Sequence, residues 1–264
     1  MTETEYDKIL EAAVSAGVIL LRSGAEVHRV EDTVIRICKA YGMDVTHTTY
    51  ALTNSMMISY DVPEENIHLS RIIQVPIDRM RLNEVIRVNQ ISRDIAKGNY
   101  TPDEAVQKIR EVENEKDTPF IVRLLAAAVA SFFFGIIFNG SVPESLIAGI
   151  AGAAAFFASA YLCAKSPKIL SNAVGGAVLA LFAVLIPLLF RNFGGTLSSE
   201  KIMLGAMMPL VPGLAFTNSF RDFANSDYLS GTVRLLDALL VCVSMAAGAA
   251  VTYRLITLIG GIAL

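Results

Sequence analysis

An apolar run that contains two prolines and ends on an ion pair has the residues to bind a small anion. It reads IMLGAMMPLVPGLAFTNSF over 202–220 and continues into Arg221 and Asp222. Pro209 and Pro212 each remove a backbone donor, and a membrane tolerates the freed carbonyls only where protein or water covers them. Broken backbone at bilayer depth therefore indicates a site, and a simple kink in a packed span is the alternative.

The residues around Pro212 determine what such a site would bind. If a new helix begins there, its positive end points inward, with Thr217 and Asn218 close behind. A carboxylate could dock at this end, as in transporters with discontinuous helices, and Arg221 would add a positive charge. We therefore assign substrate binding to Pro212, Gly213, Thr217, Asn218 and Arg221, and ion coupling to Asp222.

Asp237 is a second candidate for ion coupling. It lies near the start of the last apolar window, and Ser244, Gly248 and Thr252 follow it on the same helical face. An aspartate within a span is costly and is usually paired or functional. The alternative is a local ion pair with Arg234, three residues earlier.

Charge divides the chain into two parts at Pro119. Residues 1–119 hold 14 Lys and Arg and 20 Asp and Glu, whereas residues 120–264 hold 8 and 5. We predict a soluble domain over 1–119 and a membrane domain over 120–264. The start, TETEYDKILE, is acidic where a secretory signal would be basic, so we expect the soluble domain in the cytosol. Without a basic run there is no reason to expect nucleic acid, and three widely spaced cysteines argue against a disulfide framework or a zinc site.

The apolar pattern of residues 120–264 predicts an α-helical polytopic membrane protein whose five spans cross a lipid bilayer. Four apolar windows approach or exceed the roughly 20 residues that hydrocarbon requires, and the proline-broken run is the fifth. With the soluble domain inside, five of the eight basic residues of this part face the cytoplasm, which the positive-inside rule favours. The windows are 120–138, 142–164, 169–190, 202–220 and 235–262.

The first 119 residues predict an α+β domain. Apolar residues at helical spacing predict helices over 4–23 and 25–41, and a further helical stretch is expected over 77–97. Thr101 followed by Glu104 is a capping pattern for another helix. Three antiparallel strands are expected over 45–50, 53–60 and 67–75.

One polar cluster in this domain is a candidate site. His28, Glu31 and Asp32 are neighbours on a helix at i, i+3 and i+4, with Arg29 beside them, and could surround a metal or a water. We favour a solvated helix face instead, because a cluster on one helix needs partners that the sequence does not place. We accordingly assign no metal, no cofactor and no catalytic residue.

Three segments resemble the threonine/serine exporter family: GAEVHRVEDTVIRICKAYG over 24–42, RMRLNEVIRVNQIS over 79–92 and PLVPGLAFTNSFRDFANSDYLSG over 209–231. The resemblance covers essentially the whole chain. It implies ion-driven export of small amino acids or short carboxylates across a bacterial inner membrane, with the N-terminal domain in the cytoplasm. Longer members carry a second membrane half, so this chain looks like the split form that needs a separate small membrane subunit. In two-subunit relatives the resemblance points to succinate-like dicarboxylates as much as to threonine or serine.

Two other functions compete with a transporter. The N-terminal domain could be a membrane-tethered hydrolase, but no nucleophile or metalloprotease motif such as GxSxG or HExxH supports it. A sensor or scaffold would use the membrane part only as an anchor. A plain anchor does not require five spans, one of them broken by proline.

Overall fold

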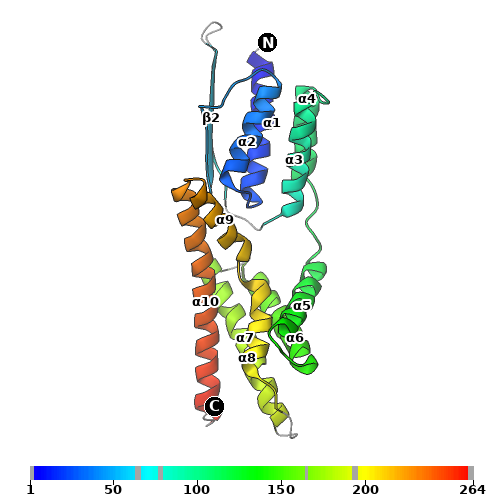
Figure 1. Cartoon of the computed structure of the whole chain (residues 1–264), viewed down its shortest axis with the longest axis vertical. Coiled ribbons are helices and arrows are strands. Elements are labelled where there is room, and N and C mark those ends of the chain that lie inside the picture. Colours follow the sequence, from blue (N-terminus) through cyan, green and yellow to red (C-terminus); the bar gives the residue numbers. More distant parts are fainter. Residues whose placement is uncertain (1–2, 63–66, 77–79, 164–165, 192–195, 261–264) are drawn as a thin grey trace. The chain divides into compact units, whose positions relative to one another are not determined.

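A computed structural model describes residues 3–62, 67–76, 80–163, 166–191 and 196–260 of the chain. Its helices and strands form two compact units (Figure 1). Unit 1 comprises Met1–Lys116 and Leu214–Leu235, and unit 2 comprises Asp117–Gly213 and Leu236–Leu264. Residues 214–235, which begin two residues after Pro212 of the broken run, therefore pack with the N-terminal part of the chain.

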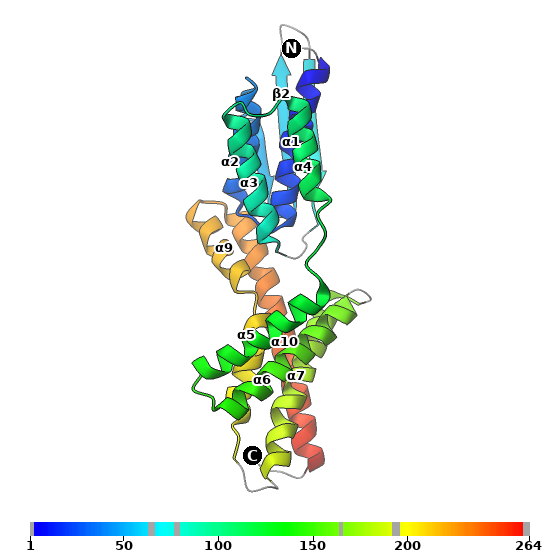
Figure 2. The ribbon, with the colours of Figure 1, turned by 90° about the vertical axis from the view of Figure 1, so that its right-hand side faces the viewer.

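In unit 1 a central pair of helices lies between a sheet and a second pair of helices (Figures 1 and 2). The central pair is α1 (Glu3–Arg22) and α2 (Val27–Ala40), and the outer pair is α3 (Leu82–Ala96) and α4 (Pro102–Glu113). More than half of the residues of α1 are buried, since they face α2, α4 and the sheet. The helix is therefore the centre of the unit's hydrophobic core.

The sheet is antiparallel in the order β1-β2-β3, as the sequence predicts. Ala51, Met56 and Ile58 are buried against the core. The first strand begins later than expected, because the Asp44 side chain accepts the Thr46 N–H at 3.1 Å and turns the chain. The strands are β1 (Thr49–Leu52), β2 (Ser55–Val62) and β3 (Ile67–Gln74).

The predicted helices of unit 1 are present, with ends shifted by a few residues. The capping box before α4 is confirmed, because Glu104 accepts the Thr101 N–H at 2.8 Å while Thr101 Oγ1 accepts the Glu104 N–H at 3.4 Å. The helix expected over 77–97 corresponds to α3, and the part of that prediction over 77–79 lies outside the described residues.

Unit 2 is built from apolar helices, which confirms the polytopic membrane fold. Among the described residues, four helices are long and apolar enough to cross a membrane, and a fifth span results if one broken pair is counted. The four are α5 (Phe120–Ile137), α6 (Val142–Cys163), α7 (Lys168–Arg191) and α10 (Tyr228–Gly260). The broken pair is α8 (Ser199–Met207), continued by the 3-10 turn Met208–Leu210, and α9 (Gly213–Ala224).

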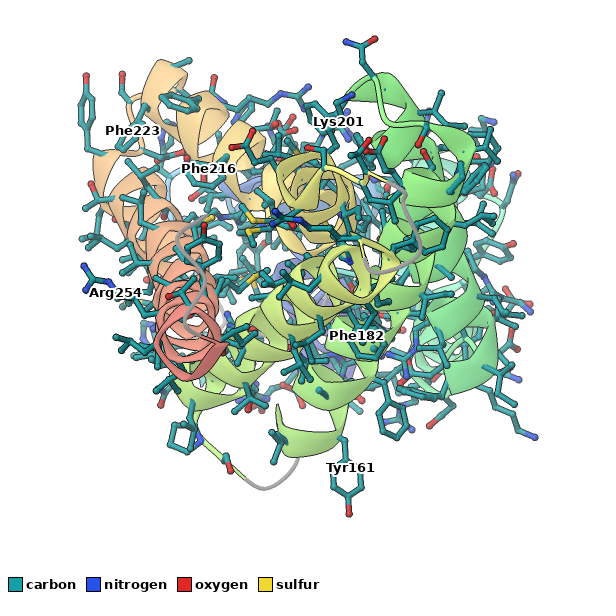
Figure 3. The ribbon with its side chains drawn as sticks, turned by 90° about the horizontal axis from the view of Figure 1, so that it is seen from below. Tyr161, Phe182, Lys201, Phe216, Phe223 and Arg254 are labelled. Carbon is teal, nitrogen blue, oxygen red and sulfur yellow. The ribbon has the colours of Figure 1, made fainter. Side chains whose placement is uncertain are left out.

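Small residues bring the helices of unit 2 into close contact, whereas large side chains such as Tyr161 point outward (Figure 3). A Cβ atom added at Gly248 of α10 would lie 1.8 Å from the Ala173 carbonyl oxygen of α7, and one at Gly176 of α7 would lie 2.0 Å from the Met245 oxygen. Neither position has room for a methyl group. The backbones of α7 and α10 therefore touch directly, as small residues in membrane helices permit.

The buried carboxylate of Glu144 holds the starts of two helices in unit 2. It accepts the Ser141 N–H at 2.6 Å and the Ser141 hydroxyl at 2.8 Å, just before α6. Its other oxygen accepts the Ser198 N–H at 2.6 Å, just before α8. Nearby, Lys201 donates to the Asn139 carbonyl at 2.8 Å. The Glu144 side chain thus joins the starts of α6 and α8, which are far apart in the sequence.

Candidate functional site

The proline-broken run forms two helices with an interruption between them, as predicted. The 3-10 turn after α8 ends at Leu210, and α9 begins at Gly213, directly after Pro212. Pro212 is half-buried and Gly213 is exposed. Helix α9 therefore begins at the predicted position, and the positive end of its dipole, which can attract an anion, lies next to Pro212.

Two of the predicted substrate ligands on α9 contact the loop between α1 and α2 in unit 1. Asn218 Nδ2 donates to the Gly24 carbonyl at 3.0 Å, and Arg221 forms an ion pair with Glu26. Gly24 has a positive φ of 77°, which suits a residue without a Cβ atom and ends α1. Thr217 lies one residue before Asn218 and is exposed. Arg221, which was predicted to bind a substrate carboxylate, therefore pairs with the Glu26 carboxylate of the same chain.

The other acidic residue of α9, Asp222, lies in a buried pair with Arg234 of α10. The Arg234 Nε atom is 3.2 Å from Asp222 Oδ2, and the two side chains are 7% and 0% exposed. The guanidinium also donates to the carbonyls of Gly24 at 3.2 Å and Ala25 at 2.5 Å. Neither oxygen of Asp222 has a well-aligned hydrogen bond among the described residues. Arg234 is therefore the opposite charge that stabilises the Asp222 carboxylate, and the Val27 N–H adds to it.

The local pair between Asp237 and Arg234, which was the alternative to a functional Asp237, does not form. In unit 2, Lys168 at the start of α7 donates to both oxygens of Asp237, at 2.9 and 2.7 Å. Arg234 instead points toward Asp222 and the two loop carbonyls, which offer a guanidinium more acceptors than one neighbouring carboxylate. Asp237 is consequently a paired and partly exposed group.

Arg234 and Glu26 complete the polar network around α9, and sequence analysis did not assign them to a site. One signal was available for Arg234, because a charged residue at the edge of an apolar window must find a partner. The identity of that partner depends on how α9 and α10 pack, which the local sequence does not contain.

The polar cluster on α2 is divided among different partners. Glu31 Oε1 accepts the Ala51 N–H of β1 at 2.8 Å, and burial raises the pKa of Glu31 although this hydrogen bond opposes the shift. His28 faces Asp32 at 3.8 Å, with both side chains more than half exposed. In the part of the chain that the structure describes, no group of three His, Cys, Asp or Glu could hold a metal. Arg29 and Asp32 line a groove between α2 and α3.

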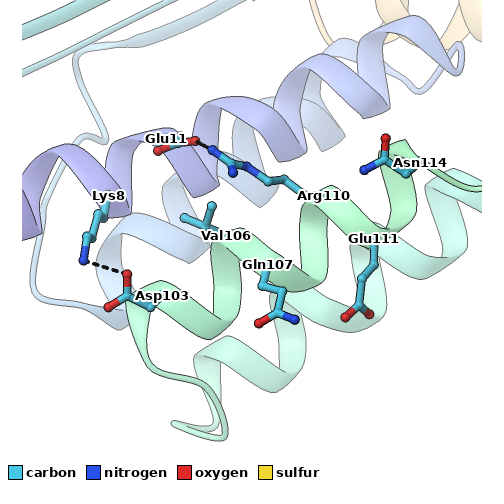
Figure 4. Close-up of a pocket in the computed structure, with 8 residues that line it drawn as sticks. All are labelled: Lys8, Glu11, Asp103, Val106, Gln107, Arg110, Glu111 and Asn114. Atoms are coloured by element: carbon cyan, nitrogen blue, oxygen red, sulfur yellow. Dashed lines mark hydrogen bonds and ion pairs between the residues drawn. The ribbon is translucent and has the colours of Figure 1, made fainter.

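A second cavity, of about 680 Å³, lies between α1 and α4 (Figure 4). Its cations are paired, because Lys8 contacts Asp103 at 2.6 Å and Arg110 contacts Glu11 at 2.5 Å. These are surface pairs of small energetic value. The cavity offers no free charge that would select a ligand.

Comparisons with known proteins point to one family. The family model for threonine/serine exporters matches residues 11–256. A curated threonine/serine exporter from Corynebacterium glutamicum is 25% identical over 244 residues, which cover 91% of this chain and 50% of that protein. The chain thus spans about half the length of the curated relative that it matches. No solved structure matches the chain.

Proposed function

Because the chain belongs to the threonine/serine exporter family, we propose that it is a subunit of a secondary transporter that exports small amino acids from the bacterial cytoplasm. The observation that carries the proposal is the break before α9, followed by Asn218 and Arg221, within the matched region. Broken helices with polar ends are a recurrent way to bind small anions in transporters. In this proposal the protein lies in the inner membrane with its N-terminus in the cytoplasm.

The substrate carboxylate binds at the first turns of α9, with Pro212 and Gly213 opening the helix and Thr217 and Asn218 supplying polar side chains. Arg221 provides the opposite charge. Since Glu26 now occupies that guanidinium, a substrate carboxylate has to exchange with Glu26 or share Arg221 with it. The exchange keeps the arginine paired with and without substrate. Succinate-like dicarboxylates offer the same carboxylate as threonine or serine and are the alternative substrates.

Ion coupling requires a carboxylate that changes its charge or its partner during transport. Asp222 and Asp237 are the two candidates, and each has a basic partner, Arg234 and Lys168 respectively. Export measured against external pH in Asp222→Asn and Asp237→Asn distinguishes them. The coupling residue is the one whose amide variant loses the pH dependence of export, and a normal profile removes that residue from the role.

A second small membrane subunit supplies the remaining wall of the transport path in this proposal. Its support is the length comparison, because the chain covers only half of the curated exporter. Alternating access generally needs two repeats or bundles around one site. Liposomes that contain the purified chain alone should therefore show no threonine or succinate flux, and robust flux from the single chain would contradict the two-subunit arrangement.

The main test compares two arginine–glutamate pairs of unit 1 in which both arginines are more than half exposed. Arg221→Ala removes the partner of Glu26 on α9, and Arg110→Ala removes the partner of Glu11 on α4. We expect Arg221→Ala to abolish export of labelled threonine from loaded cells and Arg110→Ala to leave it unchanged, at matched expression. Normal export by Arg221→Ala would exclude this arginine from the substrate site.

A further inference from the structure

A groove of about 470 Å³ between α2 and α3 in unit 1 contains three arginines. The residues of α2 that line it recur at i, i+3, i+4 and i+7, which places them on one face of the helix. The two residues from α3 are one turn apart. The α2–α3 groove is lined by Arg29, Asp32, Thr33, Arg36, Asn89 and Arg93.

None of the three guanidiniums in the groove has an ion-pair partner within the described chain. Arg36 Nη1 donates to the Ser92 hydroxyl at 3.2 Å, and Arg93 Nε donates to the Asn89 carbonyl at 3.2 Å. The one carboxylate of the groove, Asp32, has its ion-pair contact with His28. Three arginines and one aspartate give the groove a formal charge of +2. The cavity between α1 and α4 differs, since its cations are paired (Figure 4).

The contacts between the two helices show how these charges are arranged. Thr33 faces Asn89 at 3.4 Å and Arg36 faces Ser92 at 3.2 Å, so both helices advance by three residues between contacts and run parallel. Arg36 and Arg93 therefore lie at the same end of the groove. Arg29 lies two turns, roughly 10 Å, back along α2. Between the two ends the groove offers a hydroxyl, an amide and a carboxylate.

This arrangement matches one class of ligand. A phosphate monoester carries about −1.5 to −2 charges on a single group at neutral pH, and arginine recognises its oxygens through two parallel hydrogen bonds. A carboxylate carries one charge, so a carboxylate ligand would need two such groups. The volume exceeds that of a free phosphate ion and falls in the range of sites for small organic molecules.

We propose that the α2–α3 groove binds a small organic phosphate, with its phosphate group at the Arg36–Arg93 end and its hydroxyl or amino groups toward Asp32. The ligand would be a soluble metabolite that binds the N-terminal unit. Binding at this groove is independent of which substrate the membrane part exports.

The test measures binding to the full chain in detergent by isothermal titration calorimetry at constant ionic strength. The probes are adenosine monophosphate, glycerol phosphate, inorganic phosphate, succinate and acetate. We expect both esters to bind more tightly than succinate and acetate, and Arg36→Gln and Arg93→Gln each to weaken ester binding about tenfold or more. Arg87→Gln is the matched control, because Arg87 also lies on α3 but pairs with Glu115 at 2.7 Å outside the groove. It should leave affinity unchanged.

Three outcomes would overturn the proposal: no ester binding, succinate binding as tight as ester binding, or equal losses in Arg93→Gln and Arg87→Gln. Asp32→Asn tests the orientation. The amide keeps an acceptor oxygen but loses the negative charge, so the change should strengthen binding of inorganic phosphate but not of the esters, whose hydroxyl or amino groups lose a charge-assisted hydrogen bond. Equal strengthening for all phosphates would mean a general basic surface and would refute the site. Circular dichroism and gel filtration of each variant verify that it is folded.

Discussion

Replacing Arg234 by methionine should be among the most destabilising single changes in unit 1. The substitution leaves the Asp222 carboxylate buried without a counter-charge and removes the donor from the Gly24 and Ala25 carbonyls. Breaking a buried ion pair in this way costs about 3–5 kcal/mol. For a unit of this size each kcal/mol lowers the melting temperature by roughly 3–4 °C, so we expect a fall of about 10–20 °C.

Cys38 provides the assay, because the chain has no tryptophan. The thiol is fully buried on α2, and burial raises its pKa to about 12, so it should not react with a maleimide dye until unit 1 unfolds. Cys163→Ala and Cys242→Ala leave it as the single reporter. Dye fluorescence during heating then gives the melting temperature of unit 1.

Two further variants make the result interpretable. Arg110→Met removes an exposed ion pair on α4 and should shift the melting temperature by only about 0–4 °C. Asp222→Asn combined with Arg234→Met removes both charges and should recover much of the loss. If Arg234→Met melts as Arg110→Met does, or if the double change is no better than the single one, the buried pair does not hold α9 and the start of α10 in unit 1.

Three other perturbations follow from the structure. Gly248→Ala places a methyl group 1.8 Å from the Ala173 oxygen and should cost about 1–3 kcal/mol of stability, whereas the methyl group of Gly213→Ala meets no atom within 4 Å and should leave stability unchanged. The temperature at which each protein aggregates in detergent compares the two variants. Equal aggregation temperatures would contradict direct contact of α7 and α10. Burial raises the pKa of Glu31 in the folded state above its pKa in the unfolded state. The contribution of Glu31 to stability is therefore lost as the pH rises from the unfolded-state pKa through the folded-state pKa. Glu31→Gln keeps an acceptor for the Ala51 N–H and should reduce that fall; melting curves by circular dichroism between about pH 5 and about pH 7.5 test this, and an unchanged pH dependence would exclude Glu31 as its source. Alanine at both Pro209 and Pro212 should extend the helix, raise the melting temperature and depress export, and unchanged export would reduce the break to a packing kink.

Features that depend on residues close together in the sequence could be predicted from it. The capping box of Thr101 and Glu104, the antiparallel strands and the helix that begins after Pro212 all follow from short patterns. The start of the first strand was misplaced, since Asp44 makes a turn that competes with strand pairing.

The choice of partners for charged residues could not be predicted in the same way. Arg234 lies three residues from Asp237 but pairs with Asp222, and Asp237 pairs with Lys168, which is 69 residues away. Glu31 was grouped with His28, yet its carboxylate bonds to the backbone of β1. Each outcome depends on which helices and strands pack together, because a charged group takes the partner that its surroundings provide.

The position of Glu144 has a consequence for the synthesis of the protein. Ser141 is synthesised just before Glu144, whereas Ser198 is synthesised 54 residues later. At 5–20 residues per second the ribosome needs about 3–11 s to complete that interval. During this time the nascent chain contains α6 with a carboxylate that has two of its three final hydrogen bonds. Helix α7 is also made within this interval, so insertion factors and proteases encounter a bundle of α5, α6 and α7 in which the start of α8 is not yet joined to Glu144.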